Sequence, residues 1–335
     1  ITLRTVSGDV EADGIGGAPA VVHELVEGGV PLLDHVLAEG VEEGVEEADR
    51  QVVGDDFEIV LVNDGSPDDS LELAIGICTA DPHVTVVDLS RNFGHHKAMM
   101  TGLAHARGEH VFLIDSDLEE DPEWLPGFLE QLTRERCDVV FGVQAQRKGG
   151  LFERWTGQWF YSVFRLLTGM DLPQNMVTAR LMTRRYVDAL LRHDERELDI
   201  GGLWYITGFE QHPQTVNKLS SSETTYTLRR KLALFVNSVT SFSNAPLVYI
   251  FYAGLAISLL AGCYAVFLVI QWLVLAEPVS GWTSVIVSIW LLGGWVILFI
   301  GIIGIYLSKV FLEVKRRPYT IVRQVHGHGR VEREI

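Results

Sequence analysis

The sequence is poor in cysteine and lacks the cysteine spacings that bind zinc or build disulfide frameworks. Its three cysteines, Cys78, Cys137 and Cys263, lie far apart, and no CxxC pair occurs among the 335 residues. This usage fits a reducing compartment and argues against a structural zinc site. The sequence also shows no basic N-terminal region followed by an apolar segment, so we expect no signal peptide.

One long region almost lacks charge. Between Lys231 and Lys309 the only charged side chain is Glu277. An apolar run of roughly 18 or more residues predicts a transmembrane helix, because about 20 helical residues cross a ~30 Å hydrocarbon core. Two such runs fit this region, at residues 246–275 and 284–308. The sequence therefore predicts a membrane protein whose N-terminal part is hydrophilic.

Basic residues flank the two predicted spans and indicate their orientation. Arg229, Arg230 and Lys231 precede the first span, and the tail at residues 309–335 is basic, whereas the loop between the spans has no Lys or Arg. By the positive-inside rule we expect an inner or plasma membrane protein with two spans, whose large N-terminal part faces the cytoplasm. Residues 228–245 predict an amphipathic juxtamembrane helix, with packing on the soluble domain as the alternative.

The charge balance is acidic, with a net charge of −17, which argues against nucleic acid as a partner. Residues 1–56 hold fourteen Asp and Glu against two Arg, and the first 50 contain no aromatic residue and no lysine. Such composition is compatible with disorder. The alternative is that this atypical acidic segment supplies the first strand and helix of the following domain.

From residue 57 onward strand-like and helix-like segments alternate. Apolar, β-branched runs occur at FEIVLVND, HVTVVDLS, EHVFLIDSD and CDVVFGV, with helical segments between them. This alternation predicts an α/β domain over residues 57–227, with a mostly parallel sheet and helices on both faces. Ligands of such sheets bind beyond the carboxyl ends of the strands, which is where VNDGS and IDSD fall.

Six carboxylates crowd the stretch VFLIDSDLEEDPEW. Asp115 and Asp117 follow a predicted strand, and carboxylate oxygens at such a place can bind Mg²⁺ or Mn²⁺ while leaving positions for substrate phosphates. A plain polar turn is the alternative. The acids that come later are interpreted as helix N-terminal residues favoured by the macrodipole, namely Glu120, Asp121 and Glu123.

Five stretches, in this order, resemble family 2 glycosyltransferases of the GT-A fold, in the polyprenyl-phosphate glycosyltransferase branch that includes dolichyl-phosphate mannose synthase. They are EIVLVNDGSPDDS, LSRNFGHHKAMMTGLAHARGEHVFLIDSDLEEDPEWL, RLMTRRYV, VNSVTSFSNAPL and GIIGIYLSKVFLEVKRRPYTIV. The resemblance covers about residues 55–325. It implies inverting, metal-dependent sugar transfer from a UDP- or GDP-sugar to undecaprenyl or dolichyl phosphate on the cytoplasmic leaflet. Relatives of this shape often self-associate, so a homo-oligomer is a further expectation.

The resemblance also implies roles for individual residues on the donor side. Asp115 and Asp117 would hold the metal and the diphosphate, and Glu119 stands where a glutamine often adds a metal contact. Asp64 would lie near the base or ribose of the nucleotide, with an Asx-type turn as the alternative. Arg91 would be a charge partner of the diphosphate.

Basic residues after the fourth strand and before the first span are the candidates for binding the acceptor phosphate: Arg147, Arg154 and Arg229. A solvated basic loop and a plain positive-inside signal are the alternatives. His95 and His96 are expected on different faces of one helix, in surface or packing roles rather than as metal ligands. A general base is unnecessary, because a phosphate monoester with a second pKa of about 6 is already substantially dianionic at pH 7.

Two departures from the family pattern matter. Residues 1–56 contain nothing like the proline–tyrosine–asparagine–glutamate type of segment that helps relatives bind the nucleotide. The chain also has no Q-x-x-R-W motif, which argues against a processive polysaccharide synthase. The first departure motivates a second hypothesis, a catalytically inactive glycosyltransferase-like membrane scaffold. A third hypothesis is a sugar transferase that acts on a non-lipid acceptor.

Overall fold

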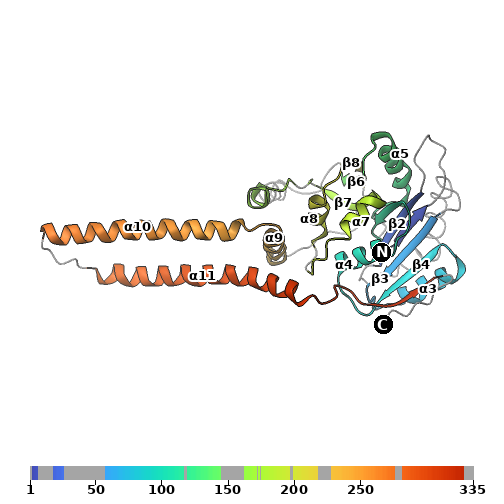
Figure 1. The fold of residues 1–335 in the computed structure, drawn as a ribbon. Helices are drawn as coiled ribbons and strands as arrows, with labels where there is room; N and C mark the ends of the chain where they lie inside the picture. Colours follow the sequence, from blue (N-terminus) through green and yellow to red (C-terminus); the bar gives the residue numbers. More distant parts are fainter. Residues whose placement is uncertain are drawn as a thin grey trace. The chain divides into compact units, whose positions relative to one another are not determined.

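The computed structural model describes residues 2–6, 18–25, 57–116, 119–144, 162–171, 173, 175–196, 199–217, 228–275 and 281–327. The chain forms two compact units. The first contains residues 1–152, 172–225 and 317–335, and the second contains residues 153–171 and 226–316. Figure 1 shows the sheet of the first unit and the long helices of the second.

The first unit is built from strands and short helices. Its described strands are β1 Thr2–Val6, β2 Ala18–Leu25, β3 Phe57–Asn63, β4 Val84–Leu89, β5 His110–Ile114, β6 Val139–Gln144, β7 Met176–Thr183, β8 Gln211–Val216 and β9 Val322–His326. Its described helices are α3 Ser70–Ala80, α4 His95–His105, the 3₁₀ turn η2 Pro122–Trp124, α5 Leu125–Glu135, α7 Arg184–Leu190 and α8 Ile200–Ile206. The described strands form one sheet in the order β8-β6-β7-β5-β1-β2-β3-β4-β9.

The central part of the sheet contains four parallel strands and the antiparallel strand β1, which lies between β5 and β2. Strands β2, β3 and β4 run parallel to one another, and β2 is also parallel to β5, so the carboxyl ends of these four strands share one edge. Strands β1, β7 and β9 add antiparallel pairings to the sheet. Helices α3 and α4 lie on opposite sides of β3 (Figure 1). The predicted α/β class with helices on both faces is confirmed.

Burial on both faces explains the continuous apolar sequence of the central strands. All five residues of β5 are buried, and β4 exposes little more than its second residue. On one face Ala74 and Cys78 of α3 pack against β3 and β4. Under α5, Phe112 and Phe128 meet edge to face with ring centroids 5.6 Å apart. The core therefore fixes the strand ends that carry the polar loops.

Two N-terminal strands complete the sheet, in the segment for which the sequence left two alternatives open. Strand β2 pairs in parallel with β3 from Val21↔Ile59 onward, and its beginning pairs with β5. The acidic segment thus supplies a central parallel strand, and β1 pairs antiparallel with β2. The remainder of residues 1–56, which includes the predicted helix, lies outside the described residues.

The chain returns from the second unit to the sheet as β9, which pairs antiparallel with β4. In this pairing Nη1 of Arg323 lies 3.1 Å from Oδ2 of Asp88, a buried carboxylate. The other oxygen of Asp88 accepts a hydrogen bond of 2.8 Å from Nδ2 of Asn63, at the end of β3. Asp88 therefore connects the returning strand to the loop-bearing end of β3.

Replacing Arg323 by alanine is expected to lower the stability of the α/β unit by about 1–2 kcal/mol, since it removes a cation from a buried carboxylate while Arg323 itself is half-exposed. Thermal unfolding of the full chain in detergent measures this effect as a lower Tm. Arg317→Ala is the matched control, because Arg317 is an exposed cation of the same tail. Equal Tm values for the two variants would contradict the role of the pair.

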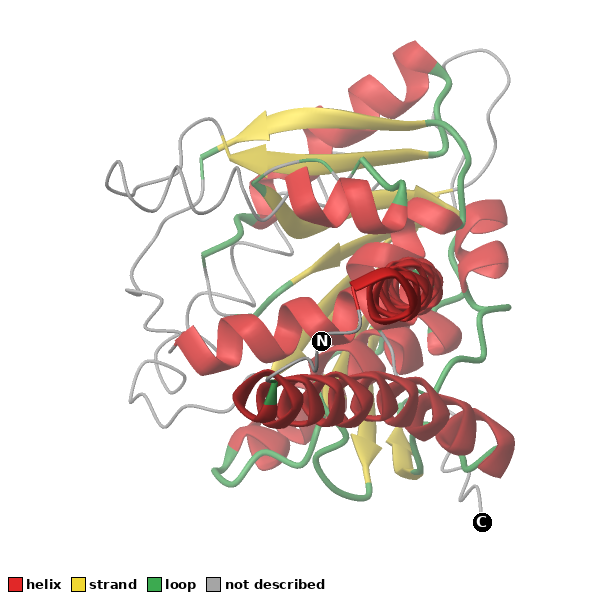
Figure 2. Cartoon of the chain, turned by 90° about the vertical axis from the view of Figure 1, so that its left-hand side faces the viewer, coloured by secondary structure: helices red, strands yellow, loops and turns green. Residues whose placement is uncertain are grey.

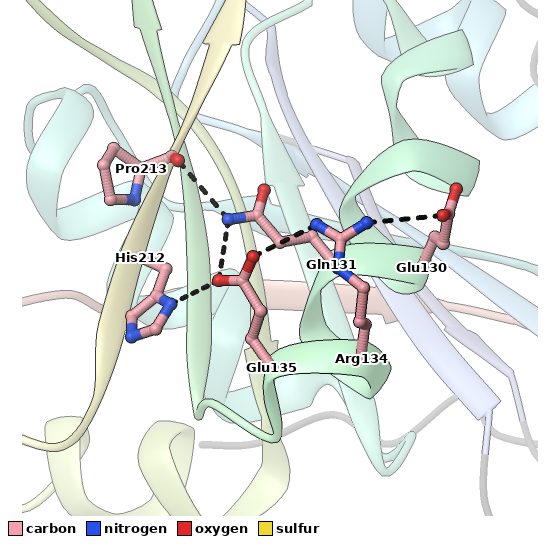
Figure 3. Close-up of polar contacts among 6 residues, drawn as sticks. All are labelled: Glu130, Gln131, Arg134, Glu135, His212 and Pro213. Atoms are coloured by element: carbon pink, nitrogen blue, oxygen red, sulfur yellow. Dashed lines mark hydrogen bonds and ion pairs between the residues drawn. The ribbon is translucent and has the colours of Figure 1, made fainter.

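A second polar cluster connects the end of α5 to the edge strand β8 (Figure 3). Glu135 contacts Nδ1 of His212, and it accepts hydrogen bonds of 3.1 Å from Gln131 and from Arg134. The other ring nitrogen of His212 lies 3.2 Å from a carboxylate oxygen of Glu210. The hydrogen bond from His212 is the main cause that lowers the pKa of Glu135 to about 2, and its bond to Glu135 raises the pKa of His212.

We expect His212→Gln to lower the Tm more at about pH 5.5 than at about pH 8. Because the pKa of His212 is raised in the folded chain, its stabilisation is complete below the unfolded value of about 6.5 and is lost as the pH rises through the folded value. The contribution of Glu135 is lost only as the pH falls from 4.5 toward about 2. Thermal unfolding of both proteins at the two pH values tests this, and an equal loss at both would contradict it.

The second unit consists mainly of three long helices among its described residues: α9 Leu228–Phe242, α10 Ala245–Leu275 and α11 Trp282–Lys315. The segments Ala245–Tyr264 and Ser288–Lys315 are long and apolar enough to cross a membrane. Helices α10 and α11 lie side by side as an antiparallel hairpin (Figure 1), and Figure 2 shows the same helices turned by 90°. The two apolar runs of the sequence thus form two long helices, and the predicted juxtamembrane segment is helical as α9.

Polar contacts fasten these helices to one another near one end of the hairpin. On α11, Nζ of Lys309 donates to Oδ1 of Asn237 at 2.6 Å and to Oγ of Ser241 at 2.8 Å, both on α9. The hydroxyl of Tyr306 donates to the carbonyl oxygen of Ser243 at 2.6 Å. Polar groups next to apolar helices require internal partners of this kind where water is scarce. They hold α9 and the start of α10 against α11.

Candidate functional site

The turn after β3 packs its backbone against the loop that follows β4. Oδ1 of Asn63 accepts a hydrogen bond of 3.1 Å from the backbone N–H of Ser66, which closes the turn. Gly65 has φ +70°, a conformation that residues with side chains rarely adopt. A Cβ at this position would lie 2.6 Å from the backbone nitrogen of Asn92. Glycine is therefore required for the two loops to touch.

Asp64 joins the same two loops through its carboxylate. Its Oδ1 accepts from the backbone N–H of Phe93 at 2.7 Å, and its Oδ2 accepts from that of Gly94 at 2.8 Å. The residue is 4% exposed. Asp64 thus holds the entry to α4 in place, and the Asx-type turn weighed for it belongs to Asn63 instead. Its contact with a nucleotide stays a prediction.

The loop after β4 leads into α4 at the carboxyl edge of the sheet. Arg91 is exposed there; its Nη1 donates to the carbonyl oxygen of Asn92 at 2.9 Å, and its guanidinium lies 4.2 Å from the centroid of the Phe93 ring. Gly94, with φ +100°, is the residue before the first turn of α4. The N-terminal end of a helix favours an anion through the helix dipole, and Arg91 precedes that end of α4 as a cation.

Asp115 lies at the same edge, directly after β5. Its Oδ1 is 3.7 Å from Nε2 of His95, the first residue of α4. The Asp115 side chain is only 14% exposed and that of His95 39% exposed. The predicted surface or packing role of His95 is not contradicted, since its side chain is partly exposed; the structure adds that its ring lies beside a predicted metal ligand. No sequence spacing indicates this contact, since it depends on α4 beginning beside the end of β5.

The role of Glu120 differs from the prediction. The sequence suggests an acid at a helix N-terminus, favoured by the macrodipole, but Glu120 is 1% exposed and binds elsewhere. Its Oε2 accepts from the backbone N–H of Asp115 at 3.3 Å, and its Oε1 accepts from that of Thr178 at 2.9 Å. The cap of the following 3₁₀ turn is Asp121, whose Oδ1 accepts from the N–H of Glu123 at 2.9 Å. The 3₁₀ turn is thus capped without Glu120, which instead accepts hydrogen bonds from backbone N–H groups after β5 and in β7.

The donor groups at this edge fit a hard divalent cation. Asp115 and the half-buried Glu119 offer carboxylate oxygens, the ligands that Mg²⁺ and Mn²⁺ prefer. Within the described part of the chain, no three His, Cys, Asp or Glu side chains gather as a ligand set. Four of the predicted site residues fall outside it or have side chains outside it: Asp117, Arg147, Arg154 and Arg229.

A separate, shallow surface pocket lies within the second unit, where α9 meets α10. It has a volume of about 440 Å³, and hydroxyl and amide groups make up most of its lining: Thr168, Thr240, Ser241, Phe242, Ser243, Asn244 and Tyr306. Its lining therefore offers mainly hydrogen bonds to an entering group.

The sequence of the chain also matches a known protein family. Residues 36–192 match the family Glycosyl transferase family 2. A protein of Mycobacterium tuberculosis (strain CDC 1551 / Oshkosh) described as "Putative glycosyltransferases" is 54% identical over 279 residues, which are 83% of this chain and 82% of that protein. The chain belongs to glycosyltransferase family 2. The resemblance seen in the sequence is thereby confirmed.

Other relatives share most of the chain length. The SfII prophage-derived bactoprenol glucosyl transferase of Shigella flexneri is 32% identical over 276 residues, 81% of this chain and 88% of that protein. Among solved structures, glucosyl-3-phosphoglycerate synthase from Mycobacterium tuberculosis, in complex with Mn²⁺, uridine-diphosphate-glucose and phosphoglyceric acid, has a TM-score of 0.41 and 19% identity. That match covers 66% of this chain and 76% of the other.

Proposed function

We propose that this glycosyltransferase moves a sugar from a UDP- or GDP-sugar to a polyprenyl phosphate at the cytoplasmic leaflet of the membrane that anchors it. The observation that carries the proposal is the combination, in one family 2 chain, of the carboxylate-lined sheet edge and two helices long enough to span a membrane. Similarity to a bactoprenol glucosyl transferase over 81% of the chain supports a lipid acceptor.

Membrane anchoring and orientation rest on the hairpin α10–α11. Only Glu277 is charged between Lys231 and Lys309, so both helices suit a hydrocarbon environment. Lys and Arg flank the hairpin on both outer sides and are missing from its loop, which favours a cytoplasmic location for the α/β unit. A water-soluble nucleotide-sugar and a membrane-bound phosphate can then meet on the cytoplasmic side.

The chemistry is a single displacement at the anomeric carbon. An oxygen of the acceptor phosphate forms a bond to this carbon, while the bond from the carbon to the nucleotide diphosphate breaks and the diphosphate leaves with the electron pair. Because the acceptor phosphate is already substantially dianionic, it needs no base from Asp171, Asp199 or another residue. The chain then contributes mainly by positioning the reactants and by placing charge.

The charges of the site suit this displacement. A divalent cation would be held by Asp115, Asp117 and Glu119, and when bound it would stabilise the negative charge that develops on the leaving diphosphate. The α4 N-terminus and Arg91 add positive potential at the same edge. Asp64 keeps the loop before α4 in place by accepting two backbone N–H groups. On the acceptor side, Arg147, Arg154 and Arg229 are the proposed phosphate partners.

The alternative of an inactive scaffold loses part of its motivation. It arose because residues 1–56 lack the family segment after the first strand. Strand β2, from this same segment, pairs in parallel with β3 and β5, so the sheet keeps a member at that position. The alternative of a non-lipid acceptor is separated by product analysis.

The test is transfer of labelled sugar by the purified chain in lipid nanodiscs. Undecaprenyl phosphate is supplied with a panel of UDP- and GDP-sugars and with Mg²⁺ or Mn²⁺, and label is counted in the organic phase. We expect incorporation with at least one donor, and its loss when EDTA is added or when undecaprenol replaces the phosphate. No incorporation from any donor, or equal incorporation into undecaprenol, would overturn the proposal.

A further inference from the structure

Strands β5 and β7 stop pairing just before Asp115, the site residue that follows β5. Their antiparallel register includes the pair Leu113↔Arg180, and its continuation would put Asp115 opposite Thr178. The two backbones do not pair there. Instead, the carboxylate of Glu120 stands between them, with Oε2 3.3 Å from the N–H of Asp115 and Oε1 2.9 Å from the N–H of Thr178. A side chain thus takes over both backbone donors at the point where the strands part.

The chemistry of this wedge requires a carboxylate. Both of its partners are N–H donors, and an ionised carboxylate accepts with both oxygens. A glutamine of the same shape offers one oxygen and one NH₂ group, so one of the two backbone donors would face another donor. Because Glu120 is only 1% exposed, water cannot supply the missing acceptor to the backbone N–H of Asp115 or Thr178.

A buried cation accompanies the buried acid. Arg180, on β7, is fully buried; its Nε donates to the carbonyl oxygen of Thr178 at 3.2 Å, and its guanidinium lies over the ring of Trp204. Burial lowers the pKa of Arg180 to about 9, and the charge of Glu120 is among the influences that oppose this shift. Among the described residues, Nη1 and Nη2 of Arg180 find no hydrogen-bond partner. The two charges therefore lie in one buried region, where each offsets part of the cost of burying the other.

We propose that Glu120 is a positioning residue of the donor site. As a carboxylate wedged between β5 and β7, it fixes the backbone of Asp115 and so sets the direction in which the Asp115 carboxylate enters the site. The inference rests on the proposed function, in which Asp115 meets the metal and the diphosphate. Glu120 acts on the site through the backbone of Asp115.

The first test uses hydrogen exchange on the full chain in detergent, without ligand. Glu120→Gln is compared with Asp121→Asn, which makes the same carboxylate-to-amide change one residue later. We expect the amides of Asp115 and Thr178 to exchange about tenfold faster in Glu120→Gln and at the wild-type rate in Asp121→Asn. Wild-type exchange in Glu120→Gln would overturn the proposal.

The second test measures Mn²⁺ binding by electron paramagnetic resonance in the presence of UDP or GDP. We expect Glu120→Gln to weaken the nucleotide-dependent Mn²⁺ affinity about tenfold, Glu120→Asp to recover part of it because both acceptor oxygens return, and Asp121→Asn to leave it unchanged. Equal affinities in Glu120→Gln and Asp121→Asn would overturn the positioning role. If the wild-type chain bound no Mn²⁺ with either nucleotide, the proposed function would fail, and the exchange comparison would still decide whether Glu120 fixes Asp115.

Discussion

Sugar transfer by the Asp115→Asn variant is expected to fall by a factor of about 10² to 10³ in kcat/KM. Asparagine keeps the shape of the side chain but removes a negative charge at the proposed metal and diphosphate site, and loss of one group that stabilises developing charge typically costs a factor of about 10² to 10³. His95, whose Nε2 lies 3.7 Å from Oδ1 of Asp115, would then face a neutral amide instead of a carboxylate. Initial rates with undecaprenyl phosphate and the active nucleotide-sugar measure the effect.

The control for Asp115→Asn is Glu123→Gln. Glu123 belongs to the same acidic stretch, and its backbone N–H is bonded to the side chain of Asp121, so the substitution removes one nearby charge without touching the strand end. We expect Glu123→Gln to keep near wild-type rates. Transfer by Asp115→Asn at more than about a tenth of the wild-type rate would remove Asp115 from the proposed site.

Gly65→Ala is expected to destabilise the α/β unit by about 3 kcal/mol or more. The left-handed backbone, with φ +70°, costs an alanine about 1–2 kcal/mol. Its Cβ would also lie 2.6 Å from the nitrogen of Asn92 and 2.8 Å from the carbonyl carbon of Arg91, both of which are backbone atoms that cannot move alone. The loop after β4 must then shift, so nucleotide binding should weaken along with stability.

Gly76→Ala provides the matched control for this prediction. Gly76 lies inside α3, and a Cβ there would meet nothing within 4 Å. The same substitution should therefore raise stability by about 0.5–1 kcal/mol, because alanine is the better helix former. Denaturant unfolding of both variants in detergent measures the two opposite changes. A Gly65→Ala protein as stable as Gly76→Ala would show that the two loops are not in close contact.

Local patterns in the sequence predict the α/β class and the two long helices. Alternating β-branched runs and helical segments predict the α/β unit because burial on both faces leaves a continuous apolar signature. Two long charge-free runs predict two long helices, because a helix that crosses a membrane is apolar along its whole length. The strands β1 and β2 could not be distinguished from disorder, because their pairing depends on β3 and β5 and the segment itself lacks aromatic residues.

Individual roles at the site were predicted less completely, since several depend on contacts between distant segments. Asp64 and Asp115 follow strands at the carboxyl edge, as their positions in the sequence indicate. His95 joins Asp115 only because α4 starts where β5 ends. Glu120 has the sequence position of a helix N-terminal acid, yet its carboxylate binds the backbone N–H groups of Asp115, after β5, and Thr178, in β7. Local charge preferences are worth less than about 1 kcal/mol, whereas two buried N–H groups without an acceptor would cost more.

The returning strand β9 has a consequence for protein engineering. Because residues 317–327 rejoin the sheet after the hairpin, the hairpin is an insertion within the α/β unit and not an appendix to it. A fragment cut before α9 would leave the backbone donors and acceptors of β4 uncovered, and an open strand edge invites association with other chains. A soluble catalytic fragment should therefore keep residues 317–327 and replace the hairpin with a short linker.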